Sequence, residues 1–388
     1  MEKDAGADGL RGLAAANVVL CHLLISVFPL GFRYLWPSSA VPGPMGVAEK
    51  LVSAPGLSLL WNGNFPVCIF FVLSGYVLTK KFFATGDTAD LTYKALRRYI
   101  RLSVPIFGSV MLALALMSFG TTALREVASM TGSAWLAQFW NFTPSFVDAL
   151  KDGAYRAILS GTSPYISLLW TMQVELIGSF LVFGYAGIAP RDRRAIPLVA
   201  VIIAILAYLS PQSWPLYAAF LAGAHVGQIK NKQSPLLVGV AVVLAILFGS
   251  YDKSPLYDWT AWISPNFFMR KHLFNVLGGI AVVYAVRAGF GAKLLESGPI
   301  QYLGRISYSL YLVHFPLVLT LLAGLYAYLA GARGWPRGQA FAIAAPVTAA
   351  TACLVASLFQ RTFDAWGIAL SRRFFPARRL DSSTPGAR

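Results

Sequence analysis

An arginine and a histidine lie eleven residues apart within one apolar run, LRGLAAANVVLCHLL at Leu10–Leu24. At 100° per residue, the directions of the two side chains around the helix axis differ by only about 20°, so Arg11 and His22 share a helix face. At a rise of about 1.5 Å per residue, His22 lies roughly 16 Å further along that helix. If the helix crosses a bilayer, Arg11 lies near one interface and His22 near the middle, where an ionisable side chain indicates a function. The alternative is a buried histidine that bonds a neighbouring helix.

Charged side chains also interrupt two later apolar runs. Arg98 and Arg101 are three residues apart, and two guanidinium groups on one helix face suit a phosphate or carboxylate ligand. Positive charge at a membrane boundary is the other interpretation of this pair. Glu175 lies within LLWTMQVELIGSFLVF, where a carboxylate is costly unless it is paired. A role at a site and a salt bridge within a helix bundle both remain open for Glu175.

A third polar group follows near the end of the chain. Ser307, Tyr311 and His314 are spaced by four and then three residues, so they share one helix face. That face either hydrogen-bonds a substrate or joins two helices. No two histidines have the spacing of three or four residues that a helical metal site needs, and no H-E-x-x-H motif occurs. The sequence therefore predicts no metal site within a single helix.

The elements that position these residues are predicted from composition. The 388 residues are 57% hydrophobic and 12% charged, about half the charged share of a soluble domain. Apolar runs of about 20 residues recur along the whole length, which predicts an all-α, polytopic integral membrane helical bundle with about ten transmembrane helices. The predicted spans are Leu10–Leu30, Phe65–Phe83, Ile100–Phe119, Tyr165–Ile188, Ile196–Leu209, Trp214–Ile229, Leu236–Phe248, Leu273–Val286, Ile306–Leu329 and Phe341–Leu370.

The organisation along the chain follows from the segments between these spans. Residues 1–375 are predicted to form a single transmembrane domain, and residues 376–388 a basic, disordered cytoplasmic tail. Residues 120–161 are polar enough for a loop with interfacial helices. The net charge of +16 is concentrated in loops and at span ends, which indicates membrane topology and anionic headgroups, not nucleic acid. The basic loops place both termini in the cytoplasm of a multi-pass protein of the plasma (cell inner) membrane.

Several separated stretches resemble the acyltransferase family 3 membrane proteins. The match rests on the following segments in order: DGLRGLAAANVVLCHL at Asp8–Leu23, FFVLSGYVL at Phe70–Leu78, RRYIRLSVP at Arg97–Pro105, LLWTMQVELIGSFLVF at Leu168–Phe183 and LGRISYSLYLVHFPL at Leu303–Leu317. Each segment alone is a weak signal, but together they cover most of the chain. The fourth has TMQVE where relatives often have Ser-Leu-x-x-Glu.

The resemblance implies a membrane O-acyltransferase, which moves an acyl group, usually acetyl, from cytoplasmic acyl-CoA to a hydroxyl of a carbohydrate or related acceptor, as in polysaccharide modification. Neutral imidazole suits a general base, and we expect His22 to take the proton of that hydroxyl. Arg98 and Arg101 are expected to hold the CoA phosphates. Arg11 is expected to orient the donor or stabilise the thioester oxyanion, while Glu175 orients one of these side chains.

The predicted partners are acyl-CoA as donor substrate, the acceptor and the lipid bilayer, with no bound cofactor. Some relatives carry an additional soluble hydrolase-like domain after the last span. A mechanism that hands the acyl group to such a domain would here need a separate periplasmic partner protein. A proton-coupled transporter or flippase of a glycan-type substrate is the alternative from another class, because it too places ionisable residues inside a membrane. The internal repeats typical of transporters are not visible in the sequence.

Overall fold

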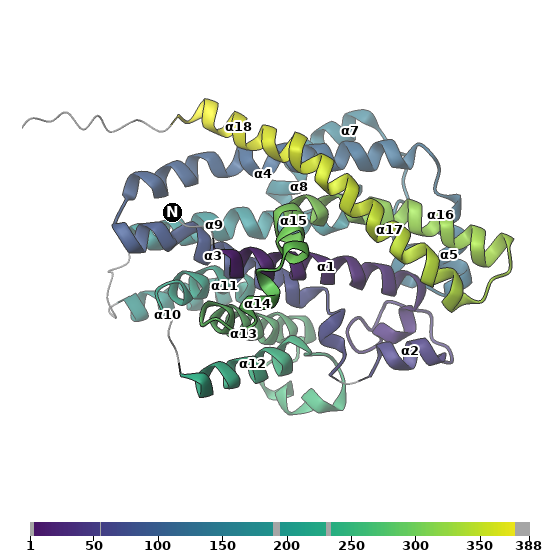
Figure 1. Cartoon of the computed structure of the whole chain (residues 1–388), viewed down its shortest axis with the longest axis horizontal. Coiled ribbons are helices and arrows are strands. Elements are labelled where there is room, and N and C mark those ends of the chain that lie inside the picture. Colours follow the sequence, from purple (N-terminus) through teal and green to yellow (C-terminus); the bar gives the residue numbers. More distant parts are fainter. Residues whose placement is uncertain (1–3, 55, 189–194, 230–233, 377–388) are drawn as a thin grey trace, which may run out of the picture.

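Long helices lying side by side build the protein (Figure 1). The computed structural model describes residues 4–54, 56–188, 195–229 and 234–376. The longer helices of this part are α1 (Ala5–Val27), α3 (Asn64–Thr85), α4 (Thr88–Met117), α9 (Trp170–Ile188), α10 (Ala195–Leu209), α11 (Trp214–Val226), α12 (Pro235–Gly249), α13 (Phe267–Arg287), α15 (Gly298–Leu317) and α17 (Arg337–Phe359). The shorter ones are α2 (Val47–Val52), α5 (Thr122–Thr131), α6 (Ala134–Ala137), α7 (Phe146–Lys151), α8 (Ala157–Ser160), α14 (Ala292–Leu295), α16 (Ala323–Tyr326) and α18 (Ala365–Phe374).

Six helical segments among the described residues are long and apolar enough to cross a membrane. They are Ala5–Val27, Asn64–Thr85, Thr88–Met117, Ser167–Ile188, Gly298–Ala332 and Arg337–Phe374. This confirms an all-α membrane helical bundle. The four other predicted spans coincide with α10, α11 and α12, which are only 13 to 15 residues long, and with α13, which carries charged residues at both ends. The total of ten spans therefore stays a prediction. The predicted tail falls mostly outside the described residues.

Helices α1 and α15 run parallel in a fixed register. A Cβ atom added to Gly12 would come within 2.5 Å of the Gly304 backbone nitrogen, so the two backbones touch at a point where only glycine fits. Ten residues further along each helix, His22 meets His314 at the same separation of 292 positions. Close contact between these helices thus brings together two residues from opposite ends of the sequence.

Helix α3 runs antiparallel to α1. Just before α3 begins, a Cβ atom on Gly63 would come within 2.9 Å of the sulfur of Cys21, near the far end of α1. Towards the other end of α3, the Tyr76 hydroxyl donates a hydrogen bond to Asp4, which caps the first turn of α1. The early residues of α3 therefore lie at the depth of Cys21, and its later residues lie at the depth of Asp4.

The segment over residues 120–161 packs into the bundle more deeply than the sequence indicates. Trp135 of α6 is 5% exposed, and its backbone N–H donates to the Ser39 carbonyl oxygen over 3.0 Å. The Tyr99 hydroxyl of α4 donates to the Ala154 carbonyl oxygen over 3.0 Å. The helices of this segment are only four to ten residues long, so their apolar contacts leave no long periodic pattern in the sequence.

Candidate active site

Two buried histidines form a hydrogen-bonded pair between α1 and α15. Nδ1 of His22 lies 3.0 Å from Nε2 of His314, and Nδ1 of His314 lies 2.9 Å from the Leu310 carbonyl oxygen. His314 is fully buried, while His22 keeps 9% of its surface exposed. The sequence places both histidines on interior helix faces, but it does not indicate that they meet.

The hydrogen-bond network fixes the tautomers of the neutral pair. A carbonyl oxygen can only accept, so Nδ1 of His314 carries the proton that it donates to Leu310. Nε2 of His314 is then an acceptor, and it takes the Nδ1–H of His22. Nε2 of His22 is left with its lone pair and makes no hydrogen bond within the described part of the chain. His22 is thereby arranged as a proton acceptor through Nε2.

Aromatic rings enclose His22 on the side towards the end of α1. The Trp135 ring stacks on His22 with centroids 5.3 Å apart and planes 13° apart. Phe315 meets the same imidazole edge-on at 5.9 Å, and Phe139 packs against both Trp135 and Phe315. Trp135 was not singled out by sequence reasoning, because it lies on a four-residue helix with no periodic pattern.

A cavity of about 310 Å³ opens among α1, α3, α4, α9 and α15. Six of the residues predicted from the sequence line it, namely Arg11, Arg98, Arg101, Glu175, Ser307 and Tyr311. His22 and His314 do not line it. Tyr311, which lines the cavity, has its ring centroid 6.0 Å from that of His314. The histidine pair therefore lies close to the cavity, next to one of its lining residues.

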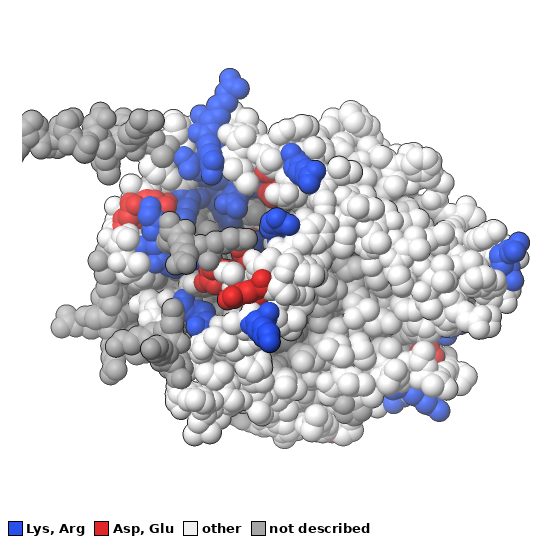
Figure 2. Space-filling view, in the orientation of Figure 1, with Lys and Arg blue, Asp and Glu red and all other residues white. Residues whose placement is uncertain are grey.

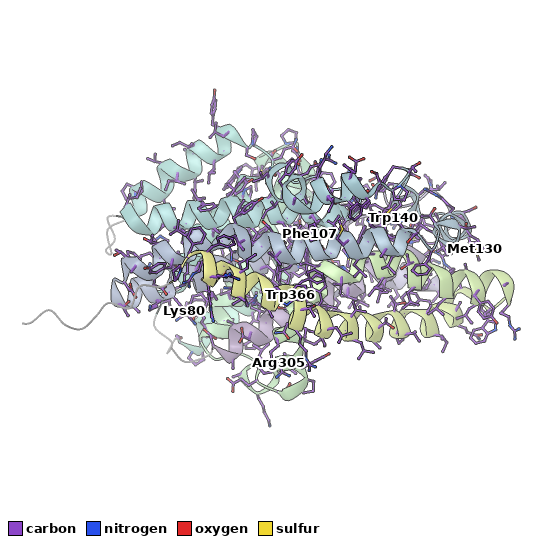
Figure 3. All side chains as sticks on the ribbon, turned by 90° about the horizontal axis from the view of Figure 1, so that it is seen from above. Lys80, Phe107, Met130, Trp140, Arg305 and Trp366 are labelled. Carbon is purple, nitrogen blue, oxygen red and sulfur yellow. The ribbon has the colours of Figure 1, made fainter. Side chains whose placement is uncertain are left out.

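The charged end of this cavity, which we call the mouth, is formed by Asp8, Arg11, Arg101, Arg305 and Asp364. Both Arg101 and Arg305 are exposed. Figure 2 shows Lys, Arg, Asp and Glu side chains gathered towards the end of the molecule where the N-terminus lies. In Figure 3, Lys80 lies towards this end and Met130 at the opposite end, with Arg305 between them. The mouth thus combines three arginines with two aspartates.

The arginines around the cavity differ in how firmly they are held. Arg98 forms a buried ion pair with Glu175, and its Nε donates to the Ser179 hydroxyl over 2.8 Å. The Ser74 hydroxyl donates to the same Glu175 carboxylate over 2.6 Å. The salt bridge that the sequence left open for Glu175 is therefore present, and much of the Arg98 guanidinium is already engaged.

Arg11 and Arg101 are held more loosely. Nη1 of Arg11 lies 3.9 Å from the Asp8 carboxylate, the pairing that the shared helix face allows. Within the described residues, no hydrogen bond or ion pair engages the Arg101 side chain. Asp364 faces both arginines from a π-helical turn, η8 (Gln360–Asp364). Such turns are frequent at functional sites, but a single inserted residue leaves no mark in the hydrophobic pattern.

The opposite end of the cavity, which we call the deep end, is mostly apolar. It is lined by Val67, Phe70, Phe71, Thr171, Met172 and Tyr311. The Tyr311 hydroxyl lies 2.9 Å from the Thr171 hydroxyl, and Thr171 donates to the Leu168 carbonyl oxygen over 2.8 Å. The two hydroxyls of this end are therefore bonded inside the protein. Across the described chain, no group of three or more His, Cys, Asp or Glu side chains could hold a metal ion.

Comparison with known proteins identifies relatives along nearly the whole chain. A protein-family model described as an acyltransferase domain matches residues 4–360. Acyltransferase R4 of Phoma sp. is 26% identical over 408 aligned positions, covering 87% of each chain. Acyltransferase clz18 of Cochliobolus lunatus is 23% identical, covering 92% of each chain. The O-acetyltransferase PaAT-1 of Phomopsis amygdali is 24% identical, covering 81% of this chain and 72% of its own. No solved structure matches the chain.

Proposed function

This chain belongs to the acyltransferase domain family, and from that premise we propose that it is a membrane O-acyltransferase that uses acyl-CoA, in the simplest case acetyl-CoA. The acceptor is a hydroxyl group of a carbohydrate or related compound, and His22 is the general base. The observation that carries the proposal is the hydrogen-bond chain from Leu310 through His314 to His22, because it leaves Nε2 of His22 free to take a proton.

The proposed step is a direct transfer. The acceptor oxygen attacks the thioester carbonyl carbon while its proton passes to Nε2 of His22. The new C–O bond forms as the C–S bond breaks, and the CoA thiolate leaves with the proton that His22 received. His314 keeps its own proton on Nδ1 throughout, because the Leu310 carbonyl oxygen continues to accept it. His314 therefore acts as a positioning residue for His22.

The mouth provides the groups for the donor. Arg101 makes no hydrogen bond to the described residues, so its N–H donors suit the CoA phosphates by charge-assisted hydrogen bonds. Arg98 lies one turn away and adds positive charge, with its orientation fixed by Glu175. Arg11 lies about 16 Å from His22 along the same helix, which is too far for it to reach a thioester oxyanion beside His22, so it is assigned to the pantetheine arm of the donor. Ser307 and Tyr311 line the path between the mouth and the histidines.

One rearrangement belongs to this proposal. Tyr311 lines the cavity and its ring lies next to His314, and in this proposal the Tyr311 ring turns aside to let the substrates reach His22. Catalytic groups are often held apart before substrates bind. The mouth lies at the end that carries the N-terminus and the last described helix. Cytoplasmic acyl-CoA would therefore enter from this side if both termini are in the cytoplasm of the cell inner membrane.

The test uses purified protein in nanodiscs with radiolabelled acetyl-CoA and a panel of hydroxyl acceptors. The variant His22→Ala is expected to bind CoA normally and to lose transfer by 100-fold or more, in the range of general-base catalysis. The matched control is His225→Ala, since His225 bonds Tyr185 on α9 and does not line the cavity. Full transfer by His22→Ala would remove the base assignment. Absence of CoA binding in the wild type would overturn acyl-CoA as the donor.

A further inference from the structure

The polarity of the cavity changes along its length. Because α3 runs antiparallel to α1, Val67 and Phe70 lie towards the depth of His22, and Leu78 lies towards the depth of Asp4. The ionisable lining residues come from the mouth and from the neighbouring Arg98–Glu175 pair. A molecule that reaches the histidines must therefore place its leading part against apolar side chains.

The deep end has few polar groups to offer a ligand. The hydroxyls of Tyr311 and Thr171 bond each other and the Leu168 carbonyl oxygen. Nearer the mouth, Ser307 donates to the Gly304 carbonyl oxygen over 2.9 Å and Ser74 donates to Glu175. A sugar has several hydroxyls that lose water on entering, and each needs a new partner. An apolar compound with a single hydroxyl can contact the deep end without leaving several hydroxyls that need new hydrogen-bond partners.

The side of His22 away from the mouth is closed by packing and by hydrogen bonds. Trp135 and Phe315 cover the imidazole. The segment that carries Trp135 is tied to the end of α1, because the Thr131 hydroxyl lies 3.3 Å from the Ser26 carbonyl oxygen and the Ser133 hydroxyl lies 3.4 Å from that of Ile25. An acceptor that came from this side would have to break these contacts, whereas the cavity already leads to Tyr311.

We infer that the acceptor is an apolar small-molecule alcohol, and that it enters through the same mouth as the acyl donor. This rests on the proposed acyl transfer and replaces its carbohydrate acceptor with an apolar one. The acyl group would be handed over on one side of the membrane, with no passage of the acceptor from the opposite side. The apolar body of the acceptor lies along α3, and its hydroxyl points towards His22.

The experiment uses proteoliposomes with radiolabelled acetyl-CoA outside only, so that only molecules whose mouth faces outward react. The acceptor probe is 12-hydroxydodecylphosphocholine, in which an apolar alkyl chain carries the hydroxyl and a zwitterionic end keeps the compound on the side where it is supplied. Glucose and N-acetylglucosamine are the carbohydrate acceptors. We expect the alcohol to be labelled when it is supplied outside. Its rate of labelling should be at least about tenfold higher than that of either sugar, a ratio typical of one mismatched polar contact. It should also be at least about tenfold higher than that of alcohol trapped inside.

A paired substitution tests the deep end itself. Val67→Thr keeps the side-chain shape but adds a hydroxyl, and we expect kcat/KM for the alcohol to fall by about tenfold while CoA affinity is unchanged. Val240→Thr, on the exposed face of α12, is the control. The inference is overturned if a sugar is the preferred acceptor, or if trapped alcohol is labelled as fast as external alcohol. In either case, CoA binding by the wild type leaves the proposed acyl transfer intact. Loss of CoA binding in the wild type overturns both.

Discussion

Nδ1 of His22 lies 3.0 Å from Nε2 of His314, although 292 positions separate the two residues in the sequence. The contact joins α1 to α15. The Leu310 carbonyl oxygen, which accepts from His314, determines which histidine donates in this contact. His22 alone would populate both neutral tautomers, with either nitrogen protonated. In the pair, only the tautomer with a free Nε2 satisfies every hydrogen bond.

The first prediction concerns His314. The amide oxygen of His314→Gln can still accept from His22, whereas His314→Leu leaves Nδ1 of His22 without a partner. We expect kcat to fall by about tenfold for Gln and by about 100-fold for Leu, within the range attributed to a positioned base, with the KM for acetyl-CoA unchanged. Steady-state kinetics with both substrates varied measure this. A purely structural role for His314 would instead lower the protein's stability in both variants without separating kcat from KM.

The second prediction concerns the ion pair between Arg98 and Glu175. Glu175→Leu leaves a buried guanidinium uncompensated, so we expect the free energy of unfolding to fall by about 3–5 kcal/mol. The double variant with Arg98→Met removes both charges and should recover most of that loss. Thermal unfolding in detergent measures the stability of all three proteins. If the double variant is no more stable than Glu175→Leu, the two side chains do not depend on each other.

The third prediction concerns Arg101 and the donor. Arg101→Gln removes one charge-assisted hydrogen bond to phosphate, and we expect the KM for acetyl-CoA to rise by roughly tenfold or more. The salt dependence of donor binding should weaken as well, because one fewer ionic contact is screened. Arg333→Gln is the control, since Arg333 is exposed and does not line the cavity. An unchanged KM in Arg101→Gln would assign the donor phosphates to other side chains of the mouth.

The fourth prediction concerns the glycine contact that sets the register of α1 and α15. Gly12→Ala adds a methyl group where a Cβ atom would lie 2.5 Å from the Gly304 nitrogen, so we expect a loss of about 1–3 kcal/mol from overpacking. It should also reduce transfer, because α1 must move away from the helix that carries His314. The control is Gly184→Ala, where the added atom meets nothing within 4 Å. Stability and turnover measured on the same samples show whether Gly12→Ala lowers both.

The sequence by itself determined the features that depend on local periodicity. Apolar runs of bilayer length predicted the helical membrane bundle. The helical repeat placed Arg11 on the face of His22, and Ser307 on the face of Tyr311 and His314. These predictions concern residues on one helix, whose relative positions follow from 3.6 residues per turn whatever the helix packs against.

Only the tertiary structure decided which helix faces meet. The pairing of His22 with His314 depends on a parallel register set by Gly12 and Gly304. The position of Trp135 over His22 depends on a short segment that no periodic pattern marks. Which helices touch depends on how their side chains fit together, and the contacting residues can be hundreds of positions apart in the sequence. The spacing of residues within one helix does not determine that fit.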